Sequence, residues 1–312
     1  MSADRLTEIL NVISVRGVVS GGAAVTGRWR AHGNVAEQLK FCAVARGEAL
    51  LMTDGIDEPI KLVAGEVAVL NARTWLELRG GSGDGPVVEV EQPSNGTIVR
   101  RDGADPERAD VFIGGRIDLN VEGSEVLAGA LPPVAHVRSA SPQAGRIRGH
   151  VNQLFAEIVE DRPGAEFAVR QYSQLLLLDV LRTFSGSTDM PPGWLRLLGD
   201  ERLRPALDLM HEHPEVSWSL DDLARSAAMS RTGFAVRFRE VAGTPPLTYL
   251  VRWRMLLAQR ELRAPESRMR PIASKLGYSS ESAFSTAFKR LLGESPQNYR
   301  SRVLHDGSAE GA

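Results

Sequence analysis

The stretch SSESAFSTAFKRLLGESPQNYR, residues 279–300, combines two phenylalanines at helical spacing with hydroxyl and basic side chains. Phe284 and Phe288 are four residues apart, so a helix places both on one inward face. Ser279 or Ser280 can cap the start of this helix, and the GESP segment at 293–296 can end it. The sequence therefore predicts an amphipathic helix with a polar outer face.

The same pattern occurs 50 residues earlier, where Phe234 and Phe238 correspond to Phe284 and Phe288. The GTPP segment at 243–246 corresponds to GESP, and Ser230 can cap the earlier helix. A further short helix precedes each of these two helices, starting after Ser219 in one case and near Pro271 in the other. A repeated helix, tight turn and second helix predicts two helix-turn-helix units.

The charge is distributed unevenly along the chain. Residues 1–194 contain 19 Lys and Arg against 25 Asp and Glu, whereas residues 231–302 contain 14 against 5, a balance of +9. A basic region in a chain whose formal net charge is −2 indicates that this part alone faces a polyanion. The alternative is a solvated basic face on an ordinary helical bundle. The repeat and the charge together favour double-stranded DNA as the partner.

An α-helix fits the major groove, so the outward side chains of the two repeated helices are the candidates for DNA contact. They are Arg231, Thr232, Ala235 and Arg239 in the first helix, and Ser282, Ser285, Thr286 and Lys289 in the second. Further arginines are candidates for contacts to phosphates: Arg252, Arg254, Arg290 and Arg300.

The C-terminal stretch resembles the signature of AraC/XylS-type transcription regulators. The matching residues are Gly277-Tyr278, Ser280, Phe284, Phe288-Lys289, Gly293-Glu294-Ser295-Pro296 and Tyr299-Arg300. Family members commonly have Arg where this chain has Thr286, so a guanine contact is not carried over to that position. The first unit has Ala235 and Val236 at positions that are often polar in the family, which leaves thymine methyl contacts or weak base readout as alternatives there. The resemblance implies regulation of transcription and RNA polymerase as a further partner.

Residues 15 to about 120 are rich in Gly, Val and short alternating runs separated by turn residues, a pattern typical of an all-β sandwich or barrel. Trp29 and the segments VARGEALL (44–51), IKLVAGEVAVLN (60–71) and EDRPGAEFAVRQYSQLLLLDVLR (160–182) resemble the cupin-type sensor domain of one AraC subgroup. The resemblance implies a barrel that binds a small-molecule effector, and Trp29, His32, Cys42 and Trp75 are the candidate effector residues. Metal-binding cupins need several His and a Glu at set positions, but Thr74-Trp75-Leu76 stands where the last His belongs. We expect no metal and no cofactor.

We therefore predict an α+β multidomain protein. Its parts are a cupin-like β-barrel sensor over 1–135, a helical dimerisation segment over 136–184, a linker over 185–193, an all-α double helix-turn-helix domain over 194–302, and a disordered tail over 303–312. The homodimer is inferred from the second helix, which is apolar nearly all round at Leu175–Leu178. No apolar run is long enough to cross a bilayer, and the single cysteine favours a reducing compartment, so we expect a cytoplasmic protein.

Two alternatives stay open at this point. One is a metal-dependent cupin enzyme fused to a DNA-binding module, which the absence of the ligand pattern disfavours. The other is a redox-sensing regulator that uses Cys42, although a buried structural thiol is the more common role for such a residue. An alkylation-repair regulator is disfavoured, because it would need several N-terminal cysteines and this chain has a single cysteine. A metal site at His211 and His213 is also disfavoured, since these residues lie two positions apart at a predicted helix end.

Overall fold

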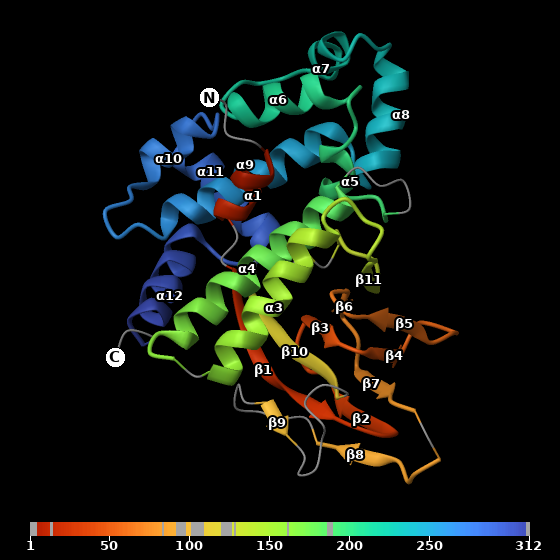
Figure 1. Cartoon of the computed structure of the whole chain (residues 1–312). Helices are drawn as coiled ribbons and strands as arrows, with labels where there is room; N and C mark the ends of the chain where they lie inside the picture. Colours follow the sequence, from red (N-terminus) through yellow and green to blue (C-terminus); the bar gives the residue numbers. More distant parts are fainter. Residues whose placement is uncertain are drawn as a thin grey trace. The chain divides into compact units, whose positions relative to one another are not determined.

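The computed structural model of the chain describes residues 5–12, 15–82, 84–91, 98–100, 109–119, 127, 129–160, 162–185 and 190–309. The chain forms two compact units, one of residues 13–191 and one of residues 1–12 together with 192–312. Strands predominate in the first unit and helices in the second (Figure 1). Helix α1 (Arg5–Val12) thus belongs to the helical unit, which corrects the predicted sensor domain that began at residue 1.

The strand-rich unit consists of two sheets that face each other. One has the strand order β11-β6-β3-β10-β1-β9 and the other the order β5-β4-β7-β2-β8. The six-stranded sheet contains β1 (Val15–Val25), β3 (Leu39–Arg46), β6 (Val67–Asn71), β9 (Ile98–Arg100), β10 (Asp110–Leu119) and β11 (Val134–Val137). The five-stranded sheet contains β2 (Trp29–Asn34), β4 (Glu48–Thr53), β5 (Ile60–Val63), β7 (Trp75–Gly80) and β8 (Val88–Val90).

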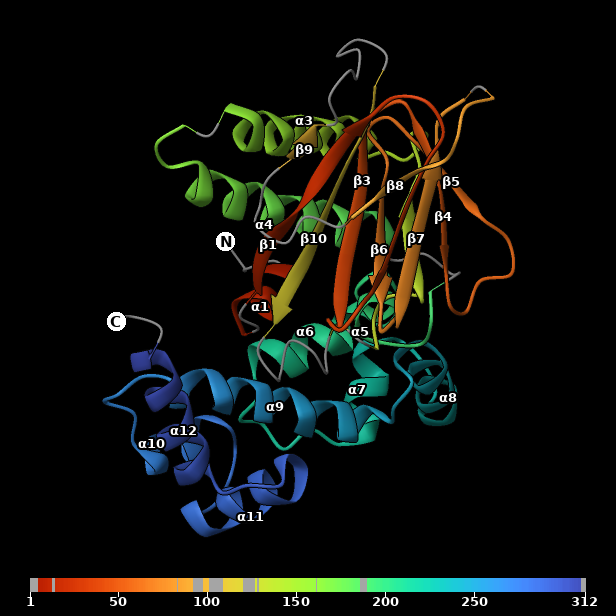
Figure 2. The same cartoon turned by 90° about the horizontal axis from the view of Figure 1, so that it is seen from below.

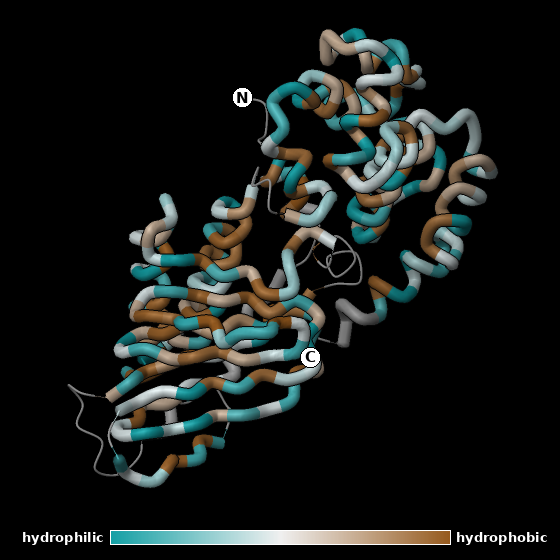
Figure 3. Tube along the Cα trace, turned by 90° about the vertical axis from the view of Figure 1, so that its right-hand side faces the viewer, coloured by the Kyte–Doolittle hydropathy of each residue, from teal (hydrophilic) through white to brown (hydrophobic). Residues whose placement is uncertain are grey.

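Alternating burial along the strands produces the core between these sheets. In β2, Trp29 and Ala31 are buried while Arg30 and His32 are exposed, because successive side chains of a strand point to opposite faces. Polar and apolar segments alternate in the same way along the strands in Figure 3. The Trp29 ring stacks on Phe112 of the opposite sheet, with centroids 4.6 Å apart.

The two sheets do not close into the predicted barrel. Among the described residues, strand pairing joins neighbours within each sheet and none across them. Alternating apolar residues specify which face of a strand points inward, and a sandwich satisfies that requirement as well as a barrel does. The sequence pattern therefore predicted the strands and their inner faces correctly, but not the closure.

Two antiparallel helices cover the outer face of the six-stranded sheet, as Figure 2 shows. They are α3 (Ala144–Glu160) and α4 (Ala165–Phe184), which are joined at Gly164. The buried Asp179 of α4 links them, because its carboxylate accepts hydrogen bonds from Arg146 at 3.3 Å and Arg182 at 3.1 Å and lies 3.2 Å from His150 Nε2. These partners compensate the cost of burying a charge.

The helical unit has two hydrophobic cores that share one long helix. The elements besides α1 are α5 (Trp194–Leu198), α6 (Arg204–Glu212), α7 (Leu220–Ser226), α8 (Arg231–Ala242), α9 (Pro246–Leu262), α10 (Met269–Lys275), α11 (Glu281–Leu292) and α12 (Pro296–Ala309). Helix α9 supplies Leu250 to the first core, and Met255, Ala258 and Leu262 to the second. No described helix has the length and apolar character that a membrane span requires.

Helix α12 corrects the predicted disordered tail. It continues to Ala309, whereas the tail was expected from residue 303. Val303 lies one helical turn after the buried Tyr299 and packs against the same core, which explains why the helix persists. Residues 310–312, and residues 186–189 of the predicted linker, lie outside the described residues.

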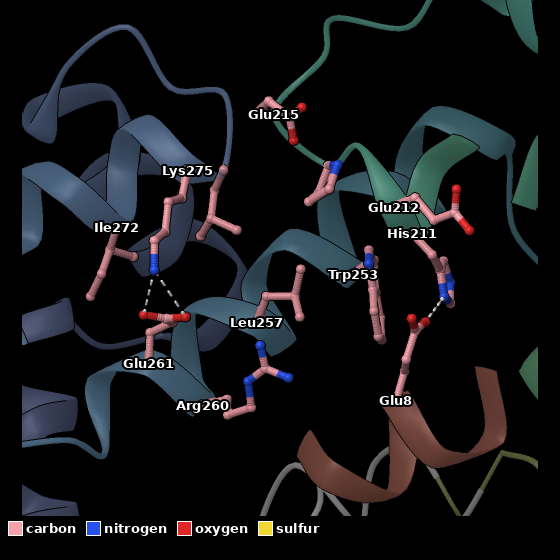
Figure 4. A pocket seen from close by; sticks show the side chains of 12 residues that line it. Glu8, His211, Glu212, Glu215, Trp253, Leu257, Arg260, Glu261, Ile272 and Lys275 are labelled. Carbon is pink, nitrogen blue, oxygen red and sulfur yellow. Dashed lines mark hydrogen bonds and ion pairs between the residues drawn. The ribbon is translucent and has the colours of Figure 1, made fainter. Parts of the chain in front are cut away.

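Helix α1 is attached to the helical unit by a buried histidine (Figure 4). The side chain of His211 is 1% exposed, and its Nδ1 lies 3.0 Å from a carboxylate oxygen of Glu8. Its Nε2 lies 2.9 Å from the hydroxyl of Tyr249, and its ring stacks on Trp253 with centroids 4.0 Å apart. Arg5 adds an ion pair to Asp208 of α6.

A neutral imidazole satisfies both contacts. A carboxylate only accepts hydrogen bonds, so Nδ1–H donates to Glu8, and in the neutral ring Nε2 accepts from the Tyr249 hydroxyl. Burial raises the pKa of Tyr249, which keeps that hydroxyl protonated. Burial also lowers the pKa of His211 below its usual value of 6.5, although Glu8 opposes this shift.

We expect the pKa of His211 to make the helical unit less stable in acid. Because the unfolded state binds a proton at His211 more readily than the folded state, its contribution is fully present above pH 6.5 and is lost as the pH falls from there toward the folded pKa. The temperature of half-unfolding of the intact chain should therefore decrease when the pH is lowered from 7.5 to 5.5. In His211→Gln this decrease should be smaller. His213→Gln is the matched control, since His213 is 54% exposed. Equal pH dependence in all three proteins would contradict the prediction.

Candidate nucleic-acid interface

Each of the two helix-turn-helix units contains a capped second helix. The Ser230 hydroxyl accepts a hydrogen bond from the backbone N–H of Gly233 at 3.2 Å, and that of Ser280 accepts from Ala283 at 3.1 Å. Gly243 and Gly293 end these helices with φ values of 70° and 78°, a left-handed conformation that favours glycine. The sequence therefore encodes the same start and stop for α8 and α11.

The aromatic packing behind the two helices is also equivalent. Phe234 and Phe238 are fully buried with ring centroids 5.7 Å apart, and Phe284 and Phe288 are fully buried at the same 5.7 Å. A tyrosine from the following helix meets the second phenylalanine edge to face in each unit. The centroid distance is 5.6 Å for both Phe238–Tyr249 and Phe288–Tyr299. The repeat of 50 residues in the sequence is thus also a repeat in the packing of aromatic side chains.

The repeat changes by one residue at the turn between the helices. Met229 N–H bonds to Ala224 C=O and Tyr278 N–H bonds to Ala273 C=O, a separation of 49 positions. The second turn contains the additional residue and has Gly277 at φ 77°, where a Cβ would come within 2.3 Å of the Glu215 carbonyl oxygen. The register of 50 therefore applies from Ser230 and Ser280 onward, and the first helices of the two units are offset differently.

The outer faces of α8 and α11 present matched stripes of side chains. The stripe of α8 consists of Thr232, Ala235, Val236 and Arg239, and the stripe of α11 of Ser282, Ser285, Thr286 and Lys289. Ala235 and Ser285 are partly buried and the other six residues are exposed. Arg231 is also exposed, and it forms an ion pair with Asp221 at 3.3 Å. Since both partners of that pair are more than half exposed, the pair is weak and the arginine can exchange it for another anion.

Two of the four predicted phosphate contacts have structural partners instead. The Arg254 guanidinium donates to the carbonyl oxygens of Pro214 at 2.6 Å and Val216 at 2.9 Å, and it lies over the Tyr278 ring. Burial lowers the pKa of Arg254. Arg300 donates to the carbonyl oxygen of Ser267 at 2.7 Å. These arginines fix the loops before α7 and α10, so we remove them from the set of DNA contacts, and the exposed Arg252 and Arg290 stay in it.

The four candidate effector residues do not converge. Trp29 and Cys42 lie in the core between the sheets, each 2% exposed, whereas His32 and Trp75 lie on the outer face of the five-stranded sheet. Burial raises the pKa of the Cys42 thiol to about 12, which disfavours the thiolate that redox chemistry needs. His32 and Trp75, with ring centroids 6.0 Å apart, line a surface pocket with Asn34, Met52, Glu77 and Arg79. Among the described residues, no group of three His, Cys, Asp or Glu is arranged to hold a metal ion.

Sequence reasoning missed the pocket beside α1. Figure 4 shows Trp253, Leu257 and Ile272 of the helical unit lining it, together with charged residues of α6, α9 and α10. The amphipathic pattern of α1 was visible in the sequence, but nothing in that pattern identified its partner. Glu8 and His211 are 203 residues apart, and only the folded chain brings them together.

Both units of the chain are similar to known proteins. A cupin family model matches residues 4–185, and a helix-turn-helix domain model matches residues 223–302. A protein of Streptomyces antibioticus named as an AraC-like transcription regulator is 35% identical over 307 residues, which are 96% of this chain and 99% of that protein. The regulator AlkR of Acinetobacter baylyi is 35% identical over 186 residues, covering 59% of this chain and 60% of AlkR. A structure of the DNA-binding domain of AdpA in complex with a target DNA is 34% identical, covers 33% of this chain and 93% of that domain, and has a TM-score of 0.31.

Two helix-turn-helix units on a shared helix, in a chain with a cupin-like unit, define a DNA-binding regulator. The chain belongs to the AraC family of transcription regulators. The predicted resemblance of both units is thereby confirmed, as is the class, since the relatives are named as transcription regulators rather than enzymes.

Substitution of Arg252 and Arg254 of α9 should distinguish an exposed guanidinium from one that has a structural role. Arg254→Gln removes two charge-assisted hydrogen bonds to carbonyls, and we expect it to lower the free energy of unfolding by roughly 1.5–3 kcal/mol. Arg252→Gln changes an exposed side chain on the same helix, so its effect should stay within about 0.5 kcal/mol. Denaturant unfolding measures both, and equal effects would show that the carbonyl contacts of Arg254 contribute nothing.

Proposed function

We propose that this regulator binds one face of a DNA duplex by placing α8 and α11 in two successive major grooves. The observation that carries the proposal is the matched pair of outward stripes on helices with the same caps and the same aromatic packing. A helix inserted in the major groove reaches base edges with outward residues spaced three or four apart, which is the spacing within each stripe. The single connecting helix α9 spans both units, so the distance between the two stripes is largely fixed.

The proposed contacts divide by chemistry. Side chains along the two stripes are the candidates for base contacts, while exposed cations around them are candidates for phosphates. The complete set is Arg231, Thr232, Ala235, Val236, Arg239, Ser282, Ser285, Thr286, Lys289, Arg252 and Arg290. Of these, Val236 was singled out from the sequence only as a position for thymine methyl contacts or weak base readout, and its exposure adds it to the contact set.

Arg239 and Lys289 occupy equivalent positions and should each contribute one cationic contact. We expect Arg239→Gln and Lys289→Gln each to weaken binding and to reduce the slope of log affinity against log salt by about 1, because one fewer counterion is released from the DNA. Lys61→Gln is the control for loss of a positive charge, since Lys61 is an exposed residue of β5 in the other unit. Titration of a selected operator duplex at several salt concentrations measures the slopes. An unchanged slope in either stripe variant would remove that residue from the interface.

We further propose that the protein is a homodimer through α4. Phe167 and Leu175 are 66% and 41% exposed, while Leu176, Leu177, Val180 and Leu181 of the same helix are buried within the unit. Large exposed apolar side chains on a helix whose other face is already packed are typical of an interface with a second copy. Each chain carries one helical DNA-binding unit, so a dimer would place two such units on the operator.

Charged substitutions on the exposed face of α4 should test the dimer. Phe167→Glu and Leu175→Glu would each bury a charge in the proposed interface, and we expect the molar mass at micromolar concentration to fall to that of one chain. Leu50→Glu is the matched control, because Leu50 is 43% exposed but lies on β4 in the five-stranded sheet. Sedimentation measures the mass. A monomeric parent protein, or a dimer that Phe167→Glu and Leu175→Glu leave intact, would exclude this interface.

Regulation by a small molecule is the remaining part of the proposal. The pocket with His32 and Trp75 on the outer face of the five-stranded sheet supports an effector site there, because it combines aromatic rings with the polar groups of Asn34, Glu77 and Arg79. An effector controls DNA binding only if it binds more tightly to one arrangement of the chain than to another. We also propose RNA polymerase as a partner, because a transcription regulator changes its activity. The proposed place of action is the cytoplasm.

A further inference from the structure

Val236 is the most exposed apolar residue of the two stripes. It lies in the middle of α8 and is 52% exposed, one turn after Thr232 and one turn before Arg239. The equivalent residue of α11 is Thr286, whose side chain has the same shape but a hydroxyl in place of one methyl group. The two stripes are thus matched in position and differ in polarity.

The whole α8 stripe is rich in methyl groups. Thr232, Ala235 and Val236 all present methyl groups, whereas α11 presents the hydroxyls of Ser282, Ser285 and Thr286 at the corresponding positions. Valine also has a lower helix propensity than most residues, so local structure does not favour it at an exposed helical position. Neither packing within the unit nor helix formation accounts for the residue.

Only one apolar group is available on the base edges of the major groove, the C5-methyl group of thymine. We propose that Val236 contacts this methyl group, so that α8 selects thymine in its half of the operator while α11 selects bases by hydrogen bonding. This inference rests on the proposed placement of α8 in the major groove. Arg239, one turn further along the same stripe, would contact a guanine or a phosphate beside the thymine.

Replacement of thymine by deoxyuridine tests the contact without changing any hydrogen bond, because it removes the C5-methyl group alone. The intact chain would first select duplexes from a random double-stranded DNA library. Each thymine of the selected duplex would then be replaced singly by deoxyuridine and the affinity measured. We expect about a fourfold loss of affinity at one thymine, corresponding to about 0.8 kcal/mol for one methyl group removed from contact.

Two variants assign the effect to Val236. Val236→Ala should bind the thymine duplex about as weakly as the parent protein binds the deoxyuridine duplex, and it should not distinguish the two. Thr286→Val is the reciprocal variant, and we expect it to gain a preference for thymine over deoxyuridine in the other half of the operator. Both residues are exposed, so the unfolding midpoints should stay close to that of the parent protein.

Each outcome of this experiment decides one question. Failure to select any duplex overturns the proposed DNA-binding mode itself. Selection of a duplex that responds to no deoxyuridine substitution overturns the thymine contact and leaves the DNA-binding mode intact. A deoxyuridine effect that persists in Val236→Ala shows that another residue contacts the methyl group, and it also overturns the inference.

Discussion

The orientation of the two outward stripes depends on the burial of paired phenylalanines. A helix of 12 residues can rotate about its axis unless something fixes it, and Phe234 with Phe238, or Phe284 with Phe288, fixes it from behind. A tyrosine of the next helix packs against the second ring in each case, which couples the rotation of α8 and α11 to α9 and α12. Loss of one ring would leave a large cavity and also release the direction in which the polar face points.

Sequence reasoning was most successful where the signal was local. The caps at Ser230 and Ser280, the inward phenylalanines and the terminal glycines of α8 and α11 all depend on neighbours within a few residues, and the structure agrees with each. Arg254 shows the limit, because its place on the polar side of α9 could not reveal that its long side chain reaches two carbonyl groups 38 and 40 residues away. Long-range partners of flexible side chains are not encoded in local pattern.

The candidate effector residues show a second limit of sequence-based prediction, and also a signal in the sequence that was missed. Trp29 and His32 are separated by three positions in one strand, so their side chains must point to opposite faces of the sheet. They could not have lined one cavity, and strand parity alone would have divided the set. Closure of the sheets is a different matter, since alternating residues are equally compatible with one closed sheet and with two open ones.

The docking of α1 places residues 13–191 between two parts of the compact helical unit, residues 1–12 and 192–312. The chain leaves the DNA-binding unit after Val12 and re-enters it at Pro192, so the inserted unit is tethered at both ends. A fragment that starts at α5 would lack the Glu8 carboxylate on His211. Cutting the chain just before α5 would therefore remove a contact from the helical unit that is retained.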